Sequence, residues 1–156
     1  MVHNYILPIY NLLYDEKFTV STFSNRLKMQ KGIYMLQELG VSVGNYGFSW
    51  YKHGPYSQSL QDEMLHTGNI DIESINLSEY SEKCIKKLHK LIHTETEYEE
   101  KDWIECVASM HYIKNYLLSK NATDEQIINA LTKKKPHLNK IDTNKLALKC
   151  LKEVFN

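Results

Sequence analysis

The stretch over residues 46–65, YGFSWYKHGPYSQSLQDEML, constrains the fold most, because a strand pattern changes there into a helix pattern. Phe48 and Trp50 alternate with less apolar neighbours, which is typical of a strand with one buried face. Gly54 permits a sharp turn, and Pro55 suits the first position of a helix, where its missing N–H is not needed. We therefore expect an aromatic strand that passes through a glycine-proline turn directly into a helix.

Apolar periodicity and end signals predict helices along most of the remaining chain. The expected helices cover about residues 5–14, 22–39, 78–93, 96–119, 123–135 and 142–155. Thr96 with Glu99, and Thr123 with Gln126, have the spacing of a capping box at two of the helix starts. Apolar residues over 70–77 indicate a second short strand or an extended wing. The chain is predicted to be mostly α (α+β), with a small β-sheet near its middle.

Length and composition indicate a single cytoplasmic domain. A chain of 156 residues is long enough to bury one sizeable core. Its 19 basic and 19 acidic residues balance, so no net field draws it to nucleic acid or to an anionic membrane. The three cysteines are widely spaced and odd in number, which favours buried thiols in a reducing compartment over a disulfide framework. The apolar runs are too short for a membrane span, and we expect no cofactor because no phosphate loop or dinucleotide motif occurs.

Several motifs together resemble a known family. KMQKGIYMLQELG at residues 28–40, followed by the aromatic strand and GPYS, is similar to the pattern of the YwgA-like proteins, which belong with the Panacea or SocA-like antitoxin domains. WIECVASMHYI at residues 103–113 resembles the second signature helix of that group, and residues 133–151 resemble its closing lysine-proline turn and helix. The pattern is also similar to the C-terminal domain of the antitoxin DarG. The motif residues given structural roles are Gln30, Tyr34, Trp50, Gly54, Pro55, Tyr56, Ser57, His111 and Pro136.

The resemblance carries expectations for topology and function. The order of elements suggests a winged-helix-like part over about residues 1–77 and a helical part over about 78–156, within one domain of residues 1–156. The resemblance favours the same topology and implies a non-enzymatic protein-interaction module. Such a module is antitoxin- or adaptor-like and neutralises or recognises a partner protein in a toxin–antitoxin or phage-related system. Self-association stays open, as does the alternative of a nucleic-acid-binding winged-helix regulator that uses a lysine loop at 133–140.

The charge pattern argues against duplex DNA as a partner. From residue 55 to residue 82 the chain contains no lysine or arginine. A recognition helix gains most of its affinity from cations near phosphate and reads guanine with arginine. The helix expected after Pro55 therefore lacks the groups that would hold a duplex.

His111 is the candidate from which a small hydrolase could be built. It lies in the middle of the apolar arc of its predicted helix, where an imidazole needs a hydrogen-bond partner. We expect a core histidine bonded to a buried amide, hydroxyl or carbonyl group, with Gln30 as a plausible partner. The G-x-S-x-G pattern of a nucleophile elbow is absent around Ser57, so no catalytic residue is expected.

His89 and His93 have the i, i+4 spacing of helical zinc ligands, and Glu97 follows one turn later. The metalloprotease pattern requires a glutamate directly after the first histidine, and Lys90 stands there instead. We therefore expect a solvated helix face and no metal site.

Two groups of polar residues are predicted to form the partner-binding surface. The outward face of the helix after Pro55 supplies an uncharged centre, and the acidic start of the helix near residue 100 supplies a charged rim. The residues concerned are Gln58, Ser59, Asp62, His66, Glu97, Glu99, Glu100 and Asp102.

Overall fold

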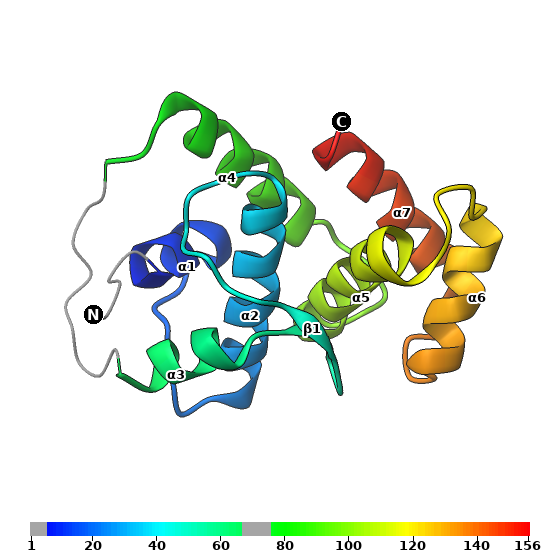
Figure 1. Ribbon diagram of the computed structural model, residues 1–156, viewed down its shortest axis with the longest axis horizontal. Helices are drawn as coiled ribbons and strands as arrows, with labels where there is room; N and C mark the ends of the chain where they lie inside the picture. Colours follow the sequence, from blue (N-terminus) through cyan, green and yellow to red (C-terminus); the bar gives the residue numbers. More distant parts are fainter. Residues whose placement is uncertain (1–5, 67–75) are drawn as a thin grey trace.

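The computed structural model describes residues 6–66 and 76–156 of the chain. Within these residues the chain forms seven α-helices, one π-helical turn and a two-stranded antiparallel sheet (Figure 1). This confirms the predicted mostly α (α+β) class, whereas most of the expected wing over 70–77 lies outside the described residues. In chain order the elements are α1 (Ile6–Tyr14), α2 (Phe23–Glu38), β1 (Ser49–Tyr51), β2 (Gly54–Tyr56), α3 (Gln58–His66), α4 (Glu79–Ile92), α5 (Glu100–Tyr112), η1 (Ile113–Leu117), α6 (Asp124–Lys134) and α7 (Ile141–Val154).

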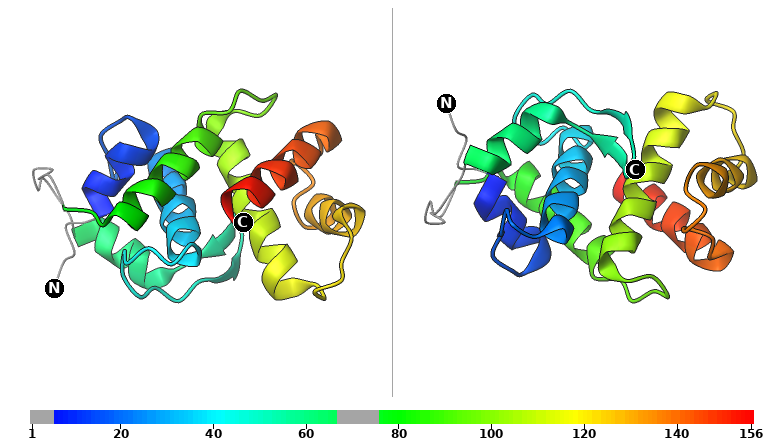
Figure 2. Two further views of the ribbon diagram at one scale, coloured as in Figure 1. Left: turned by 90° about the horizontal axis from the view of Figure 1, so that it is seen from above. Right: turned by 90° about the horizontal axis from the view of Figure 1, so that it is seen from below.

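Helix α2 lies at the centre of the molecule. Helices α1, α3, α4 and α5 and strand β2 all contact it (Figures 1 and 2). Every residue over 27–36 is buried, including Lys28, Gln30 and Lys31. Buried polar groups cost free energy unless they are hydrogen-bonded, so these three side chains must find partners inside the fold.

Helix α5 is the second central element and lies between α2 and the C-terminal pair α6 and α7 (Figure 2). Trp103 is buried at its start, and its Nε1 donates a hydrogen bond to the carbonyl of Leu91 at 2.9 Å. One apolar cluster reaches from Ile6 in α1 to Val154 in α7. Of the helices described in residues 6–66 and 76–156, none combines the length and apolar character that crossing a membrane demands.

The glycine-proline turn differs from the prediction, because Pro55 is in a strand and not in the first turn of a helix. Strand β2 pairs antiparallel with β1, with Trp50 opposite Pro55, and α3 begins only at Gln58. Proline is tolerated in an edge strand, where its missing N–H breaks no ladder bond. Ser57 precedes the helix, and its Oγ accepts the N–H of Leu60 at 3.3 Å.

The two predicted capping boxes have different outcomes. At α6, Thr123 Oγ1 accepts the N–H of Gln126 at 3.1 Å, and the Gln126 side chain accepts the N–H of Thr123 at 2.9 Å, as predicted. At α5 the prediction is wrong, because Thr96 Oγ1 accepts the N–H of Tyr98 at 3.1 Å and Glu99 is the N-cap residue. A threonine that bonds two residues along stabilises a turn, which competes with helix formation at that point.

Candidate functional site

Two glutamines of α2 hold the backbone around the β-hairpin in place. Gln30 donates from Nε2 to the carbonyl of Ser57 and accepts at Oε1 from the Ser57 N–H, both at 2.9 Å. Gln37 makes the same pair of bonds with Tyr46, at 2.8 and 2.9 Å. Each side-chain amide therefore bonds both the N–H and the C=O group of one residue, as the backbone of a neighbouring strand does in a sheet. An isolated two-stranded hairpin is marginally stable in water, so these bonds account for its fixed position.

Two buried lysines approach the same hairpin. Lys31 Nζ donates to the carbonyl of Pro55 at 2.8 Å, and Lys135 Nζ donates to the carbonyls of Tyr51 and Lys52. Burial lowers the pKa of Lys31 to about 7, and it also lowers the pKa of Lys135. Within the lysine loop predicted at 133–140, Lys135 is therefore not free to bind nucleic acid, because its buried side chain holds the turn between β1 and β2.

Glu105 of α5 supplies the counter-charge for both amines. Its carboxylate is buried, and it raises the pKa of Lys31 and of Lys135 against the larger effect of burial. Glu105 Oε1 lies 3.7 Å from Nδ1 of His53, and Oε2 lies 3.2 Å from Nε2 of His137 without hydrogen-bond geometry. Burial lowers the pKa of His53, and Glu105 opposes that shift. Such clusters occur at functional sites, but both amines here donate to backbone carbonyls, so the cluster supports the hairpin.

A groove lies between the first turns of α2, the hairpin and α3. Its volume is about 170 Å³, and aromatic and cationic side chains line it. Phe23 and Tyr51 are 42% and 53% exposed, which is high for large apolar rings. Arg26 lies over the Phe23 ring at 6.0 Å, and the ring of His53 meets the same phenylalanine edge-on at 5.0 Å. The lining residues are Phe23, Arg26, Leu27, Gln30, Lys31, Tyr51, His53, Tyr56 and Gln61.

His111 is a buried histidine with a hydroxyl partner, as expected, although that partner is Tyr34 and not Gln30. Its Nδ1 lies 2.7 Å from the hydroxyl oxygen of Tyr34, and its ring stacks on Phe155 at 4.2 Å. Burial lowers the pKa of His111 to about 4, with Lys114 adding to the shift, so the imidazole is neutral at pH 7. Gln30, the expected partner, is fully engaged with Ser57 instead.

The acidic start of α5 carries less free charge than the sequence suggested. Glu100 Oε1 lies 2.6 Å from Nζ of Lys28, which binds Glu16 at the same distance. Two further carboxylates have cationic neighbours, since Glu97 lies 3.9 Å from Lys140 and Asp102 lies 3.7 Å from Lys101. Glu99 is the N-cap residue but makes no side-chain capping bond.

The structure does not bring the two predicted partner-binding groups onto one face. Lys28 of α2 reaches Glu100 at the start of α5, whereas Gln30 reaches the backbone of Ser57 just before α3. Residues two apart in a helix point about 200° apart, so α3 and the start of α5 meet roughly opposite sides of α2. On α3, the exposed residues predicted for the interface are Gln58, Ser59, Asp62 and His66.

Trp50 and Tyr56 are only partly buried, and Trp50 packs against the edge of the apolar core. The Trp50 ring lies 5.8 Å from the ring of Tyr112, and Nζ of Lys135 lies 5.2 Å from its centroid. Pro136 follows the end of α6 at Lys134, as its helix-closing role predicts.

Sequence reasoning missed the groove and the charge cluster beneath it. No sequence pattern singled out Phe23, Arg26, Tyr51 or Glu105. One signal was present, because Lys31 and Glu105 are charged residues inside otherwise apolar stretches of α2 and α5. A buried charge of this kind requires a partner of opposite sign.

No protein-family model matches this chain, and no curated protein and no solved structure matches it either. The likeness to the Panacea or SocA-like domains therefore stays a prediction from the sequence motifs.

Proposed function

We propose that this chain is a non-enzymatic protein-interaction module, antitoxin- or adaptor-like, that binds a partner protein in the groove between α2 and the β-hairpin. The observation that carries the proposal is the exposure of Phe23 and Tyr51 at the mouth of that groove, with Arg26 beside them. Aromatic residues and arginine dominate the energetically important centres of protein interfaces.

The groove also has the rigidity that a binding surface needs. Its walls are fixed by the Gln30 bonds to Ser57 and by the Lys31 bond to Pro55. A preorganised surface loses little conformational entropy when the partner docks, so more of the contact energy appears as affinity. This supports recognition of a partner without rearrangement of the hairpin.

The chemistry of the lining favours a partner segment with an apolar side chain next to a carboxylate. The aromatic rings provide the apolar contact. The Arg26 guanidinium, whose Nη1 donates to the carbonyl of Val20 at 2.6 Å, can donate its remaining N–H groups to a carboxylate. The acidic start of α5, predicted as the charged rim of the interface, is less available to a partner because Lys28 already binds Glu100 there. In the proposed toxin–antitoxin or phage-related setting, the partner is a toxin or effector. The free cysteines Cys84, Cys106 and Cys150 support a cytoplasmic location.

Capture of the product of the neighbouring gene tests the proposal. We expect the double variant Phe23→Ala/Tyr51→Ala to lose at least about tenfold in affinity, because a hot-spot side chain contributes about 2 kcal/mol or more. The matched control, Leu65→Ala/Ile141→Ala, removes two other exposed apolar side chains, which are 59% and 44% exposed, and should bind like the wild type. Equal capture of all three proteins would contradict the proposal.

The lack of basic residues in helix α3 predicts that the protein does not bind duplex DNA. In a winged-helix reading α3 is the recognition helix, yet its sequence QSLQDEMLH contains no lysine or arginine and places Asp62 outward. We expect no appreciable binding near physiological salt in an anisotropy titration. Sub-micromolar binding with a steep salt dependence would show that phosphate contacts exist and would favour the nucleic-acid alternative.

A further inference from the structure

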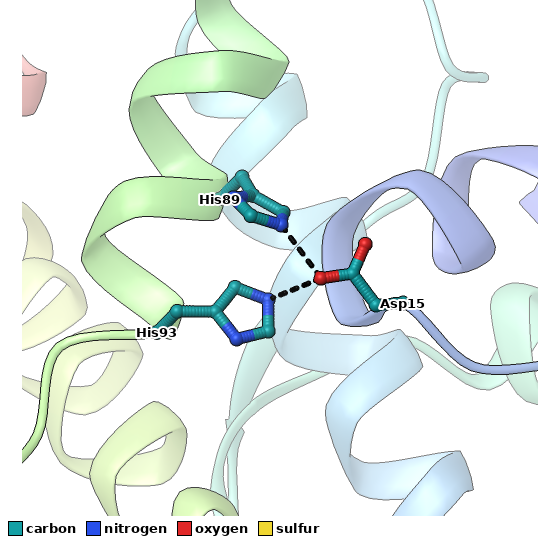
Figure 3. A group of neighbouring side chains, drawn as sticks. All are labelled: Asp15, His89 and His93. Carbon is teal, nitrogen blue, oxygen red and sulfur yellow. Dashed lines mark hydrogen bonds and ion pairs between the residues drawn. The ribbon is translucent and has the colours of Figure 1, made fainter.

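Three potential metal ligands at the ends of two helices meet at one point of the surface. Helix α1 ends beside the last turns of α4, so that Asp15 faces His89 and His93 (Figure 3). Nε2 of His89 lies 2.8 Å from Oδ2 of Asp15, and Nε2 of His93 lies 3.4 Å from the same oxygen. The third ligand that the sequence suggested, Glu97, is instead near Lys140.

These distances are close to those of ligands around a bound zinc ion. With zinc–ligand bonds of about 2.0–2.1 Å, neighbouring ligands of a tetrahedral site lie about 3.3 Å apart. The three ligand atoms lie within 4.8 Å of one another, so small side-chain rotations suffice to place an ion between them. The carbonyl oxygen of Leu13, 3.0 Å from Nε2 of His93, is a further oxygen at the same place.

The backbone holds Asp15 in a conformation that few residues tolerate. Its φ is +55°, in the left-handed region, and its N–H donates to the carbonyl of Asn11 at 2.9 Å to end α1. Asparagine and aspartate adopt this conformation more readily than other non-glycine residues.

The site is accessible to an ion from solvent. The side chains of His89, His93 and Asp15 are 39%, 32% and 64% exposed. Three protein ligands with an open fourth position are typical of zinc sites that bind water or a further ligand. By contrast, the group Asp102, Glu105 and His137 lies beside Lys31 and Lys135, whose charges disfavour a second cation.

We propose that Asp15, His89 and His93 form a binding site for a divalent transition-metal ion of the zinc class, which links the end of α1 to the end of α4. Imidazole nitrogen with a single carboxylate is a ligand set that suits Zn²⁺ and Co²⁺. The site lies apart from the groove between α2 and the hairpin and does not rest on the proposed interaction function.

Zinc and cobalt titrations of the whole chain test the site. We expect one ion per chain by calorimetry, and a Co²⁺ spectrum without the thiolate charge-transfer band that cysteine ligation would give. Zinc at about 100 times its Kd should raise the melting temperature by about 5–10 °C, because the ion binds the folded state. Absence of saturable binding, or a thiolate band, would overturn the proposal.

Variants separate a metal site from a simple ion pair. Asp15→Asn keeps a residue that tolerates the left-handed backbone but removes the charge, and His93→Gln removes one imidazole. Each variant should bind zinc at least tenfold more weakly than the wild type. The zinc-induced rise in melting temperature is taken relative to the same variant without metal, so that a loss of packing caused by the substitution does not affect the comparison. His137→Asn, at the other group of ligands, is the matched control and should bind as the wild type does. Unchanged affinity in both site variants, or loss only in the control, would show that the ion binds elsewhere.

Discussion

Replacing Gly54 by alanine is expected to lower the free energy of unfolding by about 2–5 kcal/mol, the sum of about 1–2 for a left-handed backbone and about 1–3 for overpacking. Gly54 has a φ of +92°, and a Cβ there would lie 2.3 Å from Oγ of Ser109, a side chain with no exposed surface. The close approach of β2 to α5 therefore depends on the absence of a side chain. Urea denaturation of wild type and variant measures the difference.

Two controls divide that cost into its parts. Gly40 has a similar φ of +89°, but a Cβ there meets its nearest atom at 3.8 Å, so Gly40→Ala carries the backbone cost alone. In a Ser109→Ala background the nearest atom to a Cβ at position 54 is 3.5 Å away, which is ordinary contact, so part of the loss should be recovered. Equal losses for Gly54→Ala and Gly40→Ala, with no recovery, would mean that β2 does not pack on α5 in this way.

Replacing Glu105 by glutamine is expected to destabilise the fold by about 3–5 kcal/mol, because it leaves buried positive charge without its partner. Lys31 and Lys135 are both buried, and Glu105 is the acidic group that raises the pKa of each. Glu97→Gln is the matched control, since Glu97 is 76% exposed and 3.9 Å from Lys140. An exposed pair of that kind contributes about 0–1 kcal/mol, so the control should unfold almost as the wild type does.

The same cluster contributes to the dependence of stability on pH. The pKa of Lys31 is about 7 in the folded protein and 10.5 when unperturbed, so between these values the unfolded state binds more protons. Unfolding free energy should therefore rise with pH from about 7 upward, and the slope should be smaller in Lys31→Met. If Glu105→Gln is as stable as the Glu97→Gln control and Lys31→Met leaves the slope unchanged, Glu105 is not the partner of the buried lysines and burial does not lower the pKa of Lys31.

Local patterns in the sequence were sufficient for most helices and insufficient for the contacts that define the site. The capping box at Thr123 was predictable because both of its bonds join residues three apart. Thr96 has the same spacing, yet its hydroxyl bonds Tyr98, and nothing local distinguishes the two. Pro55 fits a helix start and an edge strand equally well by its own chemistry, and pairing with Trp50 decided between them.

The candidate sites depend on contacts between distant residues, which one sequence does not reveal. Lys31 and Glu105 are 74 positions apart, as are Asp15 and His89. The spacing of His89 and His93 in the sequence revealed two of the ligands. The third, Asp15, follows α1, and no periodic pattern in the sequence links that position to α4. A single charged or polar residue inside an apolar helix is the sequence signal that a distant residue must contact it.

Hydrogen exchange of the free protein and of its complex with the captured partner tests the central claim most directly. If the groove is the binding site, amide protection should increase over residues 23–31 and 51–57, which line or support it. The amides of α3 beyond Gln61 and those at the acidic start of α5 should exchange at unchanged rates. Protection confined to those two segments, with no change around Phe23 and Tyr51, would contradict the account.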